Sequence, residues 1–357
     1  MRREVVLMCL IIFMADLVSG ILSPTFSLYA QSLGASLAFI GTLSSIVGLT
    51  QLFTSMPIGV LSDRYGRKIV LTLGMVSFAA ATTLYAFSPN VVVLIPGRIL
   101  LGLASVSTFS IGVAYVGDVV TPTERGLAFG LYTTAMGLGF GIGPLIGAAV
   151  AVNYGIPASY LVAAALALIG ALLAVWGLRN HPTTQSAITT RSFGLLRAGF
   201  AQMIHDPRLL AGSLCNLLIS TGFSGAITNF FPVYAAQNRA TQESINSMFS
   251  VRAFGSTLAR LPSGAITSRL PSRAVMVAAL LLAMIAIFGM AQTNGLVLLS
   301  VLLIVEGVSF GMFLPSGQAF TAEHSTPTTR GQIIGAYSTA GSLGGALSPL
   351  VLGLIAE

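Results

Sequence analysis

The amino-acid sequence predicts an all-α membrane protein made of two pseudo-symmetric six-helix bundles, the second of which lacks its last helix. Three observations support this fold class. The 357 residues are 55% hydrophobic and only 8% charged, whereas soluble domains are roughly 25% charged. Apolar segments of membrane-spanning length recur along the whole chain. The two halves of the chain also align with each other at one constant offset.

Eleven apolar segments are long enough to cross a bilayer, which takes about 20 helical residues. They are expected at residues 6–29, 38–61, 69–87, 91–116, 128–151, 156–178, 208–234, 244–267, 274–291, 296–321 and 332–355. The first follows Arg2 and Arg3 and so resembles a signal peptide. Because it continues past Asp16 and Pro24 without a cleavage pattern, it is interpreted as a first spanning helix.

The loops between these segments differ in charge, and this difference predicts the orientation. Five loops on one side carry a single basic residue, Arg239. The other side carries thirteen, namely Arg2, Arg3, Arg64, Arg67, Lys68, Arg125, Arg179, Arg191, Arg197, Arg208, Arg269, Arg273 and Arg330. Since cytoplasmic loops are enriched in Lys and Arg, we expect a multi-pass protein of the cell (inner) membrane with a cytoplasmic N-terminus.

Other classes of function find no support in the residues. The net charge is +7, but with one Lys and no long basic run it does not favour a nucleic-acid partner. His181, His205 and His324 lack metal-ligand spacing, and Cys9 and Cys215 lie in apolar segments. The glycine clusters lack the strand-to-helix context of a phosphate-binding loop. Neither an enzyme, a metal site nor a cofactor is expected.

The longest polar stretch separates the two predicted domains. Residues 1–178 form a six-helix bundle, residues 179–207 a cytoplasmic linker, and residues 208–357 a bundle of five helices. Within the linker, RSFGLLRAGFAQMI has the spacing of a short amphipathic helix on the membrane face, and a simple tether is the alternative.

An internal repeat relates the two domains. At an offset of 205 residues, TPTERG at 121–126 aligns with TPTTRG at 326–331, and Pro144 aligns with Pro349. Parallel repeats of this kind build secondary transporters with a site at the interface of the halves. A counterpart of segment 156–178 would occupy about 361–383, beyond Glu357. We therefore expect a truncated twelfth helix, with a protein that works with eleven as the alternative.

The sequence GVLSDRYGRK follows the second segment and resembles the loop signature of the major facilitator superfamily. Such a cluster is expected to latch the two halves at a cytoplasmic gate, where its basic residues can pair with nearby acids and its first glycine allows close helix contact. The expected gate residues are Gly59, Asp63, Arg64, Gly66, Arg67, Lys68, Asp118, Glu124 and Arg125. Ser268 replaces the aspartate in the second copy, which predicts a weaker latch there.

The fifth segment resembles the antiporter motif of drug:proton antiporters within that superfamily. Its residues are Gly130, Gly139, Gly143, Pro144 and Gly147, with Ala148 where the family has a further glycine. We expect these small residues to form a groove for a helix of the other half, with the proline bending the helix. Generic glycine packing is the alternative.

Four ionisable residues inside the segments are candidates for proton coupling: Asp16, Arg98, Arg252 and Glu306. A charge at such depth costs on the order of 3 kcal/mol or more and is functional by default. The alternative for Glu306 is a fixed ion pair with Arg252, and the alternative partners of Arg98 are backbone carbonyls. The first and tenth helices line the central cavity in the family that the motifs resemble.

Aromatic and polar residues complete the expected substrate cavity. They are Phe13, Phe26, Tyr29, Phe223, Asn229, Phe230, Phe310 and Gln318. The resemblance implies a secondary transporter, and we expect a monomeric proton antiporter that exports a small organic or drug-like compound by alternating access. A proton-coupled uptake symporter, a sugar or metabolite transporter, and a non-transporting membrane sensor or scaffold are the alternatives.

Overall fold

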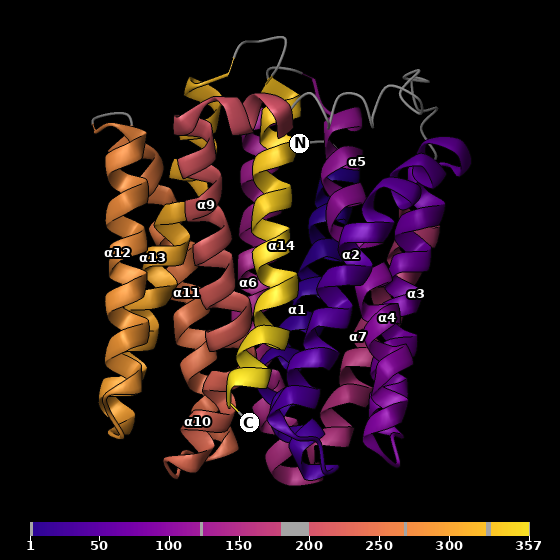
Figure 1. Cartoon of the computed structure of the whole chain (residues 1–357). Coiled ribbons are helices and arrows are strands. Elements are labelled where there is room, and N and C mark those ends of the chain that lie inside the picture. The colour runs from indigo at the N-terminus through magenta and orange to yellow at the C-terminus, as the bar shows by residue number, and fades with distance from the viewer. Residues whose placement is uncertain (1–2, 122–123, 180–199, 268–269, 326–329, 357) are drawn as a thin grey trace.

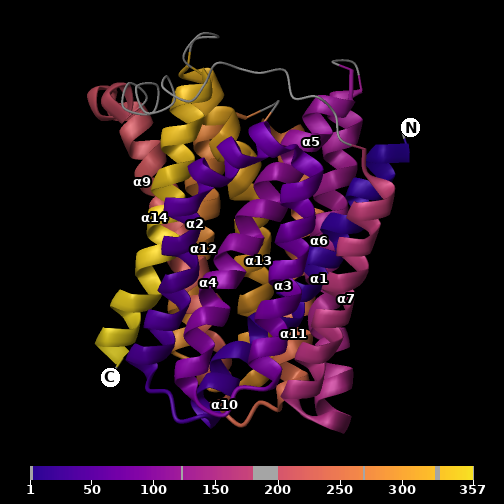
Figure 2. The ribbon, with the colours of Figure 1, turned by 90° about the vertical axis from the view of Figure 1, so that its right-hand side faces the viewer.

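A computed structural model describes residues 3–121, 124–179, 200–267, 270–325 and 330–356, which form long helices and, within those ranges, no strand. Figures 1 and 2 show the helices running side by side along one axis, with the two chain ends at opposite ends of that axis. The helices before the linker are α1 (Arg3–Ser32), α2 (Leu37–Tyr65), α3 (Arg67–Ala86), the short η1 (Val91–Val93), α4 (Leu94–Ser105), the π-helical η2 (Val106–Ser110), α5 (Ile111–Val119), α6 (Arg125–Tyr154) and α7 (Ile156–Gly177).

The helices after the linker repeat this pattern. They are α9 (Pro207–Thr221), the π-helical η3 (Gly222–Phe230), α10 (Phe231–Gln237), α11 (Gln242–Thr267), α12 (Ser272–Ala291), α13 (Leu296–Glu323) and α14 (Arg330–Ala356). We call the end of the molecule with Arg3, Tyr65, Val119, Gly177, Thr267 and Glu323 the N face, and the end with Ser32, Ala86, Tyr154, Gln237, Ala291 and Ala356 the C face.

Local sequence explains where the helices begin and end. The Ser36 hydroxyl accepts a hydrogen bond from the Phe39 amide (3.3 Å) and caps α2, and the Asp206 carboxylate accepts one from the Arg208 amide (2.9 Å) ahead of α9. Gly66 separates α2 from α3 at a φ of +95°, and Gly155 separates α6 from α7 at +85°. Residues that carry a side chain rarely adopt such positive φ angles. Glycine, which has no Cβ atom, therefore allows these tight turns.

Ten candidate membrane spans lie in the described residues, which makes this a multi-pass membrane protein. The expected segment 244–267 is also helical, as α11, but it is not apolar enough to count among them. The reason is visible in its packing, because its polar residues Asn246, Arg252 and Ser256 are buried inside the protein. The polarity of α11 therefore belongs to its inward face.

The repeat appears in the helix contacts. The offset of 205 residues places α2 on α11 and α6 on α14. In the structure α2 packs along α14, and the corresponding pair, α11 and α6, packs in the same way. Buried apolar residues form one cluster from Val5 to Leu178 and three smaller clusters between Met203 and Ala336.

Candidate functional site

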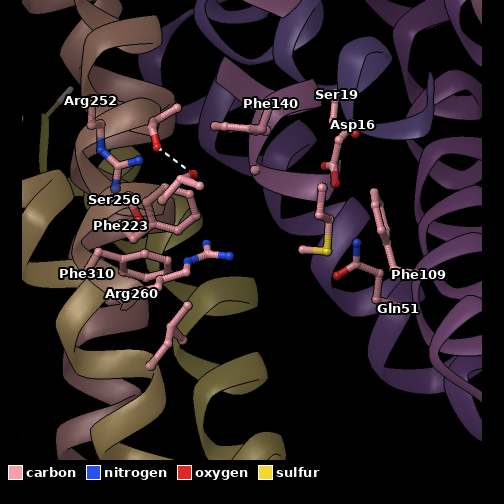
Figure 3. A pocket seen from close by; sticks show the side chains of 15 residues that line it. Asp16, Ser19, Gln51, Phe109, Phe140, Phe223, Arg252, Ser256, Arg260 and Phe310 are labelled. Carbon is pink, nitrogen blue, oxygen red and sulfur yellow. Dashed lines mark hydrogen bonds between the residues drawn. The ribbon is translucent and has the colours of Figure 1, made fainter. Parts of the chain in front are cut away.

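A cavity of about 470 Å³ lies between the helices that precede the linker and those that follow it. One wall comes from α1, α2, η2 and α6, and consists of Asp16, Ser19, Gln51, Phe109, Met136, Gly137 and Phe140. The other wall comes from η3, α11 and α13, and consists of Phe223, Arg252, Ala253, Ser256, Thr257, Arg260, Phe310 and Leu314. Figure 3 shows the two walls facing each other. Both π-helical segments contribute an aromatic ring, and such segments are frequent at functional sites.

Asp16 on α1 is the acidic residue in this lining. Its side chain is only 5% exposed, and its buried Oδ2 atom has no hydrogen-bond partner. No Lys, Arg or His nitrogen among the described residues lies within 4.0 Å of its carboxylate. A buried polar group without a partner is costly. The carboxyl group can lower that cost by holding a proton or by binding a cation in the cavity.

Arg252 and Glu306 form a buried ion pair. The Arg252 Nε and Glu306 Oε2 atoms are 2.5 Å apart, and the two side chains are 3% and 1% exposed. The guanidinium also lies 4.6 Å from the ring centroid of Phe223 and 5.7 Å from that of Phe310. Glu306 is absent from the cavity lining, whereas Arg252 belongs to it. This geometry matches the alternative of a fixed ion pair between these two residues.

Arg260 lies on the same wall as Arg252, eight residues further along α11. Its buried Nε atom has no hydrogen-bond partner, and no carboxylate among the described residues lies within 4.0 Å. Asp16 and Arg260 are close enough to interact electrostatically. Sequence reasoning assigned no role to Arg260. Its position inside a spanning segment was the available signal, since intramembrane charges mark functional sites.

Arg98 was expected to face the cavity, but it does not belong to the lining. It is 7% exposed, donates from Nη2 to the Ser44 hydroxyl at 3.2 Å, and places its guanidinium carbon 3.2 Å from the Phe26 ring centroid. The Ser44 hydroxyl in turn donates to the side-chain carbonyl of Asn229 on η3. Arg98 therefore supports a contact between the two halves of the chain.

Of the expected cavity aromatics, Phe223 and Phe310 line the cavity, with ring centroids 4.5 Å apart. Phe26 and Tyr29 are instead buried in the hydrophobic cluster of the first half. Phe13 lies beside Gly139 on α6.

The remaining expected residues lie elsewhere. Phe230 lines a separate pocket between η3, α12 and α14. Gln318 is exposed, and Asn229 is buried at the contact with Ser44. Sequence reasoning missed Gln51, Phe109 and Phe140, which line the cavity. Gln51 is polar inside an apolar segment and was the one detectable signal among these three.

Arg67 and Glu124 of the expected gate cluster contact residues of the first half of the chain. Arg67 pairs with Asp118 on α5 and lies 3.4 Å from Asp63 on α2. The Glu124 carboxylate accepts hydrogen bonds from the amide (3.1 Å) and hydroxyl (2.8 Å) of Thr121.

The other members of that cluster have local roles. The Arg64 guanidinium carbon lies 5.4 Å from the Tyr65 ring centroid, and Lys68 is half-buried in the first turn of α3. The side chain of Arg125 lies outside the described residues. The expectation of close helix contact at Gly59 was wrong, because a Cβ atom there would meet nothing within 4 Å.

The glycines of the fifth segment pack differently from the prediction. A Cβ atom on Gly139 or Gly143 would lie 2.5 Å from a backbone carbonyl oxygen of α1, and one on Gly147 would lie 3.3 Å from Ile21 of α1. These residues therefore pack against a helix of their own half. Gly137 and Gly141 instead face Thr257 and Phe254 of α11.

Helix geometry explains why the two sets of glycines face different helices. Residues four apart lie on one face of a helix, while residues two apart lie about 200° away. Positions 139, 143 and 147 therefore share the α1 face, and positions 137 and 141 share the α11 face. Gly130 contacts neither helix, since a Cβ atom there would have nothing within 4 Å.

Three hydrogen bonds between the two halves, within the residues that the structure describes, lie on the C-face side of the cavity. Besides the Ser44–Asn229 contact, the Asn246 side-chain amide donates to the Pro144 carbonyl at 3.1 Å, and the Leu350 amide donates to the Ser45 hydroxyl at 3.1 Å. The cavity lies at mid-depth of the helices and extends along α11 and α13 toward the N face. These three bonds therefore hold the two halves together toward the C face, which is the lower end of the molecule in Figure 1.

Comparisons with known proteins agree on one family. The profile of the Major Facilitator Superfamily matches residues 8–241 and, in a second match, 212–357. The chain is 23% identical over its full length to an uncharacterised MFS-type transporter of Methanocaldococcus jannaschii, 92% of which is covered. It is 32% identical to multidrug resistance protein 2 of Bacillus subtilis over 47% of this chain and 42% of that protein. The solved structure of the nucleoside transporter NupG superposes with a TM-score of 0.80 at 19% identity, covering 99% of this chain and 91% of that one.

Proposed function

This chain belongs to the Major Facilitator Superfamily, and we propose that it is a proton-coupled secondary transporter that exports a small organic compound in exchange for protons by alternating access. Members of this family are transporters and not enzymes. The observation that carries the proposal is the buried, unpaired carboxyl group of Asp16 in a cavity whose two walls come from the two repeats.

Asp16 has the properties that coupling requires. A lone buried carboxylate is unfavourable, so its proton can leave only when a cation replaces it or when the cavity opens to water. The cavity lies between repeats that can rock against each other about a midplane site. Rocking would expose Asp16 to one side of the membrane and then to the other. Proton binding and the direction of exposure would thereby be linked.

Similarity to known proteins favours antiport, in which the compound is exported in exchange for protons. A relative that matches nearly half of the chain is named a multidrug resistance protein, and the glycine pattern of α6 resembles that of drug:proton antiporters. The cavity has apolar aromatic walls with few charges, which suits amphipathic compounds. Uptake by symport is the second candidate, because a solved nucleoside transporter shares the fold.

We further propose eleven spanning helices, with α11 as the eighth. The six helical spans of residues 1–178 and the five of residues 208–357 would form two bundles joined by the linker at 179–207. The separate hydrophobic clusters and the equivalent α2–α14 and α11–α6 contacts support this division. We place the protein in the cell membrane as a monomer with a cytoplasmic N-terminus, because basic loop residues are retained on that side.

The experiment replaces Asp16 with asparagine in purified protein reconstituted into liposomes. Ethidium and the quinolone norfloxacin serve as probes, a pH gradient is imposed, and a trapped pH dye reports protons. The wild-type protein should move at least one probe against its gradient, with protons moving in the opposite direction. Asp16→Asn should lose this gradient-driven movement but retain exchange of probe for probe, since exchange needs no proton.

Glu243→Gln is the matched control, because Glu243 is an exposed carboxylate in the first turn of α11, away from the cavity. It should behave like the wild type. Full gradient-driven transport by Asp16→Asn would refute coupling at this residue. Proton movement in the same direction as the probe would establish symport instead.

A further inference from the structure

The cavity presents one unpaired acid and one unpaired base on opposite walls. Asp16 belongs to α1 in the first repeat, and Arg260 belongs to α11 in the second. Figure 3 shows both side chains at the cavity, on the two walls that face each other. We infer that the compound carried is a zwitterion with an apolar, aromatic body, whose cationic end binds Asp16 and whose anionic end binds Arg260. This inference rests on the proposed function and specifies its substrate.

The two groups lack partners within the described protein. The buried Oδ2 atom of Asp16 and the buried Nε atom of Arg260 have no hydrogen-bond partner. They do not form an ion pair with each other within 4.0 Å. The large majority of buried side-chain polar atoms in folded proteins are satisfied. Here the Nη2 atom of Arg252 in the same lining also lacks a hydrogen-bond partner, and such exceptions around one cavity indicate that a ligand supplies the missing partners.

The other charges around the cavity are already neutralised. Arg252 lines the same wall, and its charge is balanced by Glu306, whose Oε2 atom lies 2.5 Å from Nε, although its buried Nη2 atom has no hydrogen-bond partner. The hydroxyl of Tyr132 on α6 donates to the Phe109 carbonyl at 3.1 Å. With Asp16 ionised, the cavity therefore holds one free negative and one free positive charge. These are complementary to a ligand with one charge of each sign.

Singly charged ligands fit less well. A cation would pair with Asp16 and leave the buried Nε atom of Arg260 without a partner. An anion would pair with Arg260 and leave the carboxylate of Asp16 in the same condition. A site built to bind a polar group discriminates strongly against analogues that lack it, because its own buried groups then remain unpaired.

The rest of the lining defines the body of the ligand. Phe109 and Phe140 lie on the first wall, and Phe223 and Phe310 lie on the second with ring centroids 4.5 Å apart. A cavity of about 470 Å³ falls in the range of small-molecule sites. The body that fits is thus a flat, apolar group of one or two rings between the two charged ends.

This assignment also explains exchange. A proton and the cationic end of the ligand compete for the same carboxylate, so a ligand that binds the protonated protein displaces one proton from Asp16. The charged and titratable groups around Asp16 are Arg252 and Arg260 in the cavity lining and Tyr132 on α6. Arg252 is paired with Glu306, which lies outside the lining. Ligand affinity should therefore fall as the pH is lowered.

Matched probes can test the assignment. The zwitterionic probe is a biphenyl with an aminomethyl group at one end and a carboxylate at the other. Its carboxamide is the cationic probe, and its analogue with methyl in place of aminomethyl is the anionic probe. A second set on a single benzene ring covers a shorter charge separation. Affinities for purified full-length protein are measured by titration calorimetry, and proton release is measured in weak buffer.

The expected result is a pattern across two variants. In either the biphenyl set or the benzene set, the wild-type protein should bind the zwitterionic probe at least about tenfold more tightly than the cationic and anionic probes of the same set. A tenfold difference in affinity is about 1.4 kcal/mol. Arg260→Gln should abolish the preference over the cation while retaining that over the anion. Asp16→Asn should abolish the preference for the zwitterion over the anion while retaining that over the cation. It should also abolish proton release. Arg260→Lys, which keeps the charge, should retain most of the preference if the glutamine variant folds poorly.

Arg208→Gln is the control for loss of one positive charge, because Arg208 is exposed at the start of α9 and lies outside the cavity. It should leave all three affinities unchanged. The inference is overturned if the wild-type protein prefers the cation, binds the three probes equally, or binds neither zwitterion. It is also overturned if both variants reduce all affinities alike.

The failure of this inference can be told apart from failure of the proposed function. If the zwitterion is not preferred, but a cationic probe still releases protons in a manner that needs Asp16, proton coupling stands and the substrate class is wrong. Suppose instead that the zwitterion is preferred as expected while Asp16→Asn still transports a probe when driven by the pH gradient. In that case the substrate class stands and coupling at Asp16 is wrong.

Discussion

The Ser44 hydroxyl on α2 donates a hydrogen bond to the side-chain carbonyl of Asn229 on η3, across the contact between the two repeats. The same hydroxyl accepts a hydrogen bond from Arg98 at 3.2 Å. Both Ser44 and Asn229 are buried, on the C-face side of the cavity. A charged donor on one side and an amide on the other thus hold the repeats together where they must separate for the cavity to open toward the C face.

Ser44→Ala should shift the protein toward conformations that are open at the C face. The bond between the repeats joins two neutral groups, and such a bond contributes about 0.5–1.5 kcal/mol, so the ratio of open to closed protein should rise by roughly two- to tenfold. The measurement is the distance between spin labels at Ser32 on α1 and Gln237 on α10, in protein whose Cys9 and Cys215 are replaced by alanine. A longer label distance in Ser44→Ala is expected.

Ser77→Ala provides the control for this prediction. Ser77 is half-buried on α3, and its hydroxyl donates an exposed hydrogen bond to the Leu73 carbonyl of its own helix at 2.8 Å. Its replacement should leave the distribution of label distances unchanged. Identical distributions in Ser44→Ala and the parent protein would mean that the Ser44–Asn229 contact does not hold the C face closed.

Glu306→Gln should destabilise the protein strongly. The substitution leaves the Arg252 guanidinium buried at 3% exposure without its carboxylate, and breaking a buried pair from one side costs about 3–5 kcal/mol. The double replacement Arg252→Met with Glu306→Leu should recover most of that loss, since an apolar pair leaves no buried charge. Thermal unfolding in detergent measures all three proteins.

This prediction also separates two roles for Glu306. If Glu306 forms a fixed ion pair, Glu306→Gln should lower the melting temperature and leave proton release intact. Proton release should then be lost only in Asp16→Asn. If Glu306→Gln folded with wild-type stability and lost proton release, Glu306 would itself be a coupling residue.

Asp118→Asn should have only a small effect on stability. Arg67 pairs with Asp118, but that carboxylate is 38% exposed, and Arg67 keeps Asp63 as a neighbour at 3.4 Å. Exposed ion pairs contribute about 0–1 kcal/mol. A change in melting temperature of a few degrees at most is expected, and a large loss would show that this pair stabilises more of the N face than its contacts indicate.

The repeat explains why much of the fold could be predicted from the sequence. A constant offset implies equivalent packing in both halves, and α2 indeed packs on α14 as α11 packs on α6. Hydropathy also located the spanning helices to within a few residues. The expected segment 244–267 is also a helix, α11, but it is not apolar enough to count as a candidate span, since its buried polar residues Asn246, Arg252 and Ser256 lower its hydropathy.

The site was harder to predict because the charge and depth of a residue do not determine the direction in which its side chain points. Arg98 lies in a span like Arg260, yet it turns toward Ser44 and Phe26 and away from the cavity. Glu306 lies at a depth similar to that of Asp16 but has a partner one helix away. Which intramembrane charges are paired depends on the rotation of each helix about its axis, and composition alone does not specify that rotation.

Replacement of Gly143 by alanine should destabilise the packing of α6 against α1. A Cβ atom at this position would lie 2.5 Å from the Leu17 carbonyl oxygen and 2.8 Å from the Gly20 Cα atom. Because both are backbone atoms, α1 has to move, and such overpacking costs about 1–3 kcal/mol. Asp16 precedes Leu17, so displacement of α1 should also reduce gradient-driven transport.

Gly130→Ala is the matched control on the same helix, since a Cβ atom there would meet nothing within 4 Å. Alanine is favoured over glycine inside a helix by about 0.5–1 kcal/mol, so this variant should be as stable as the wild type or slightly more stable. Melting temperatures and gradient-driven transport of the two variants are compared directly. Equal effects at the two positions would show that the glycines of α6 act through backbone flexibility and not through their contact with α1.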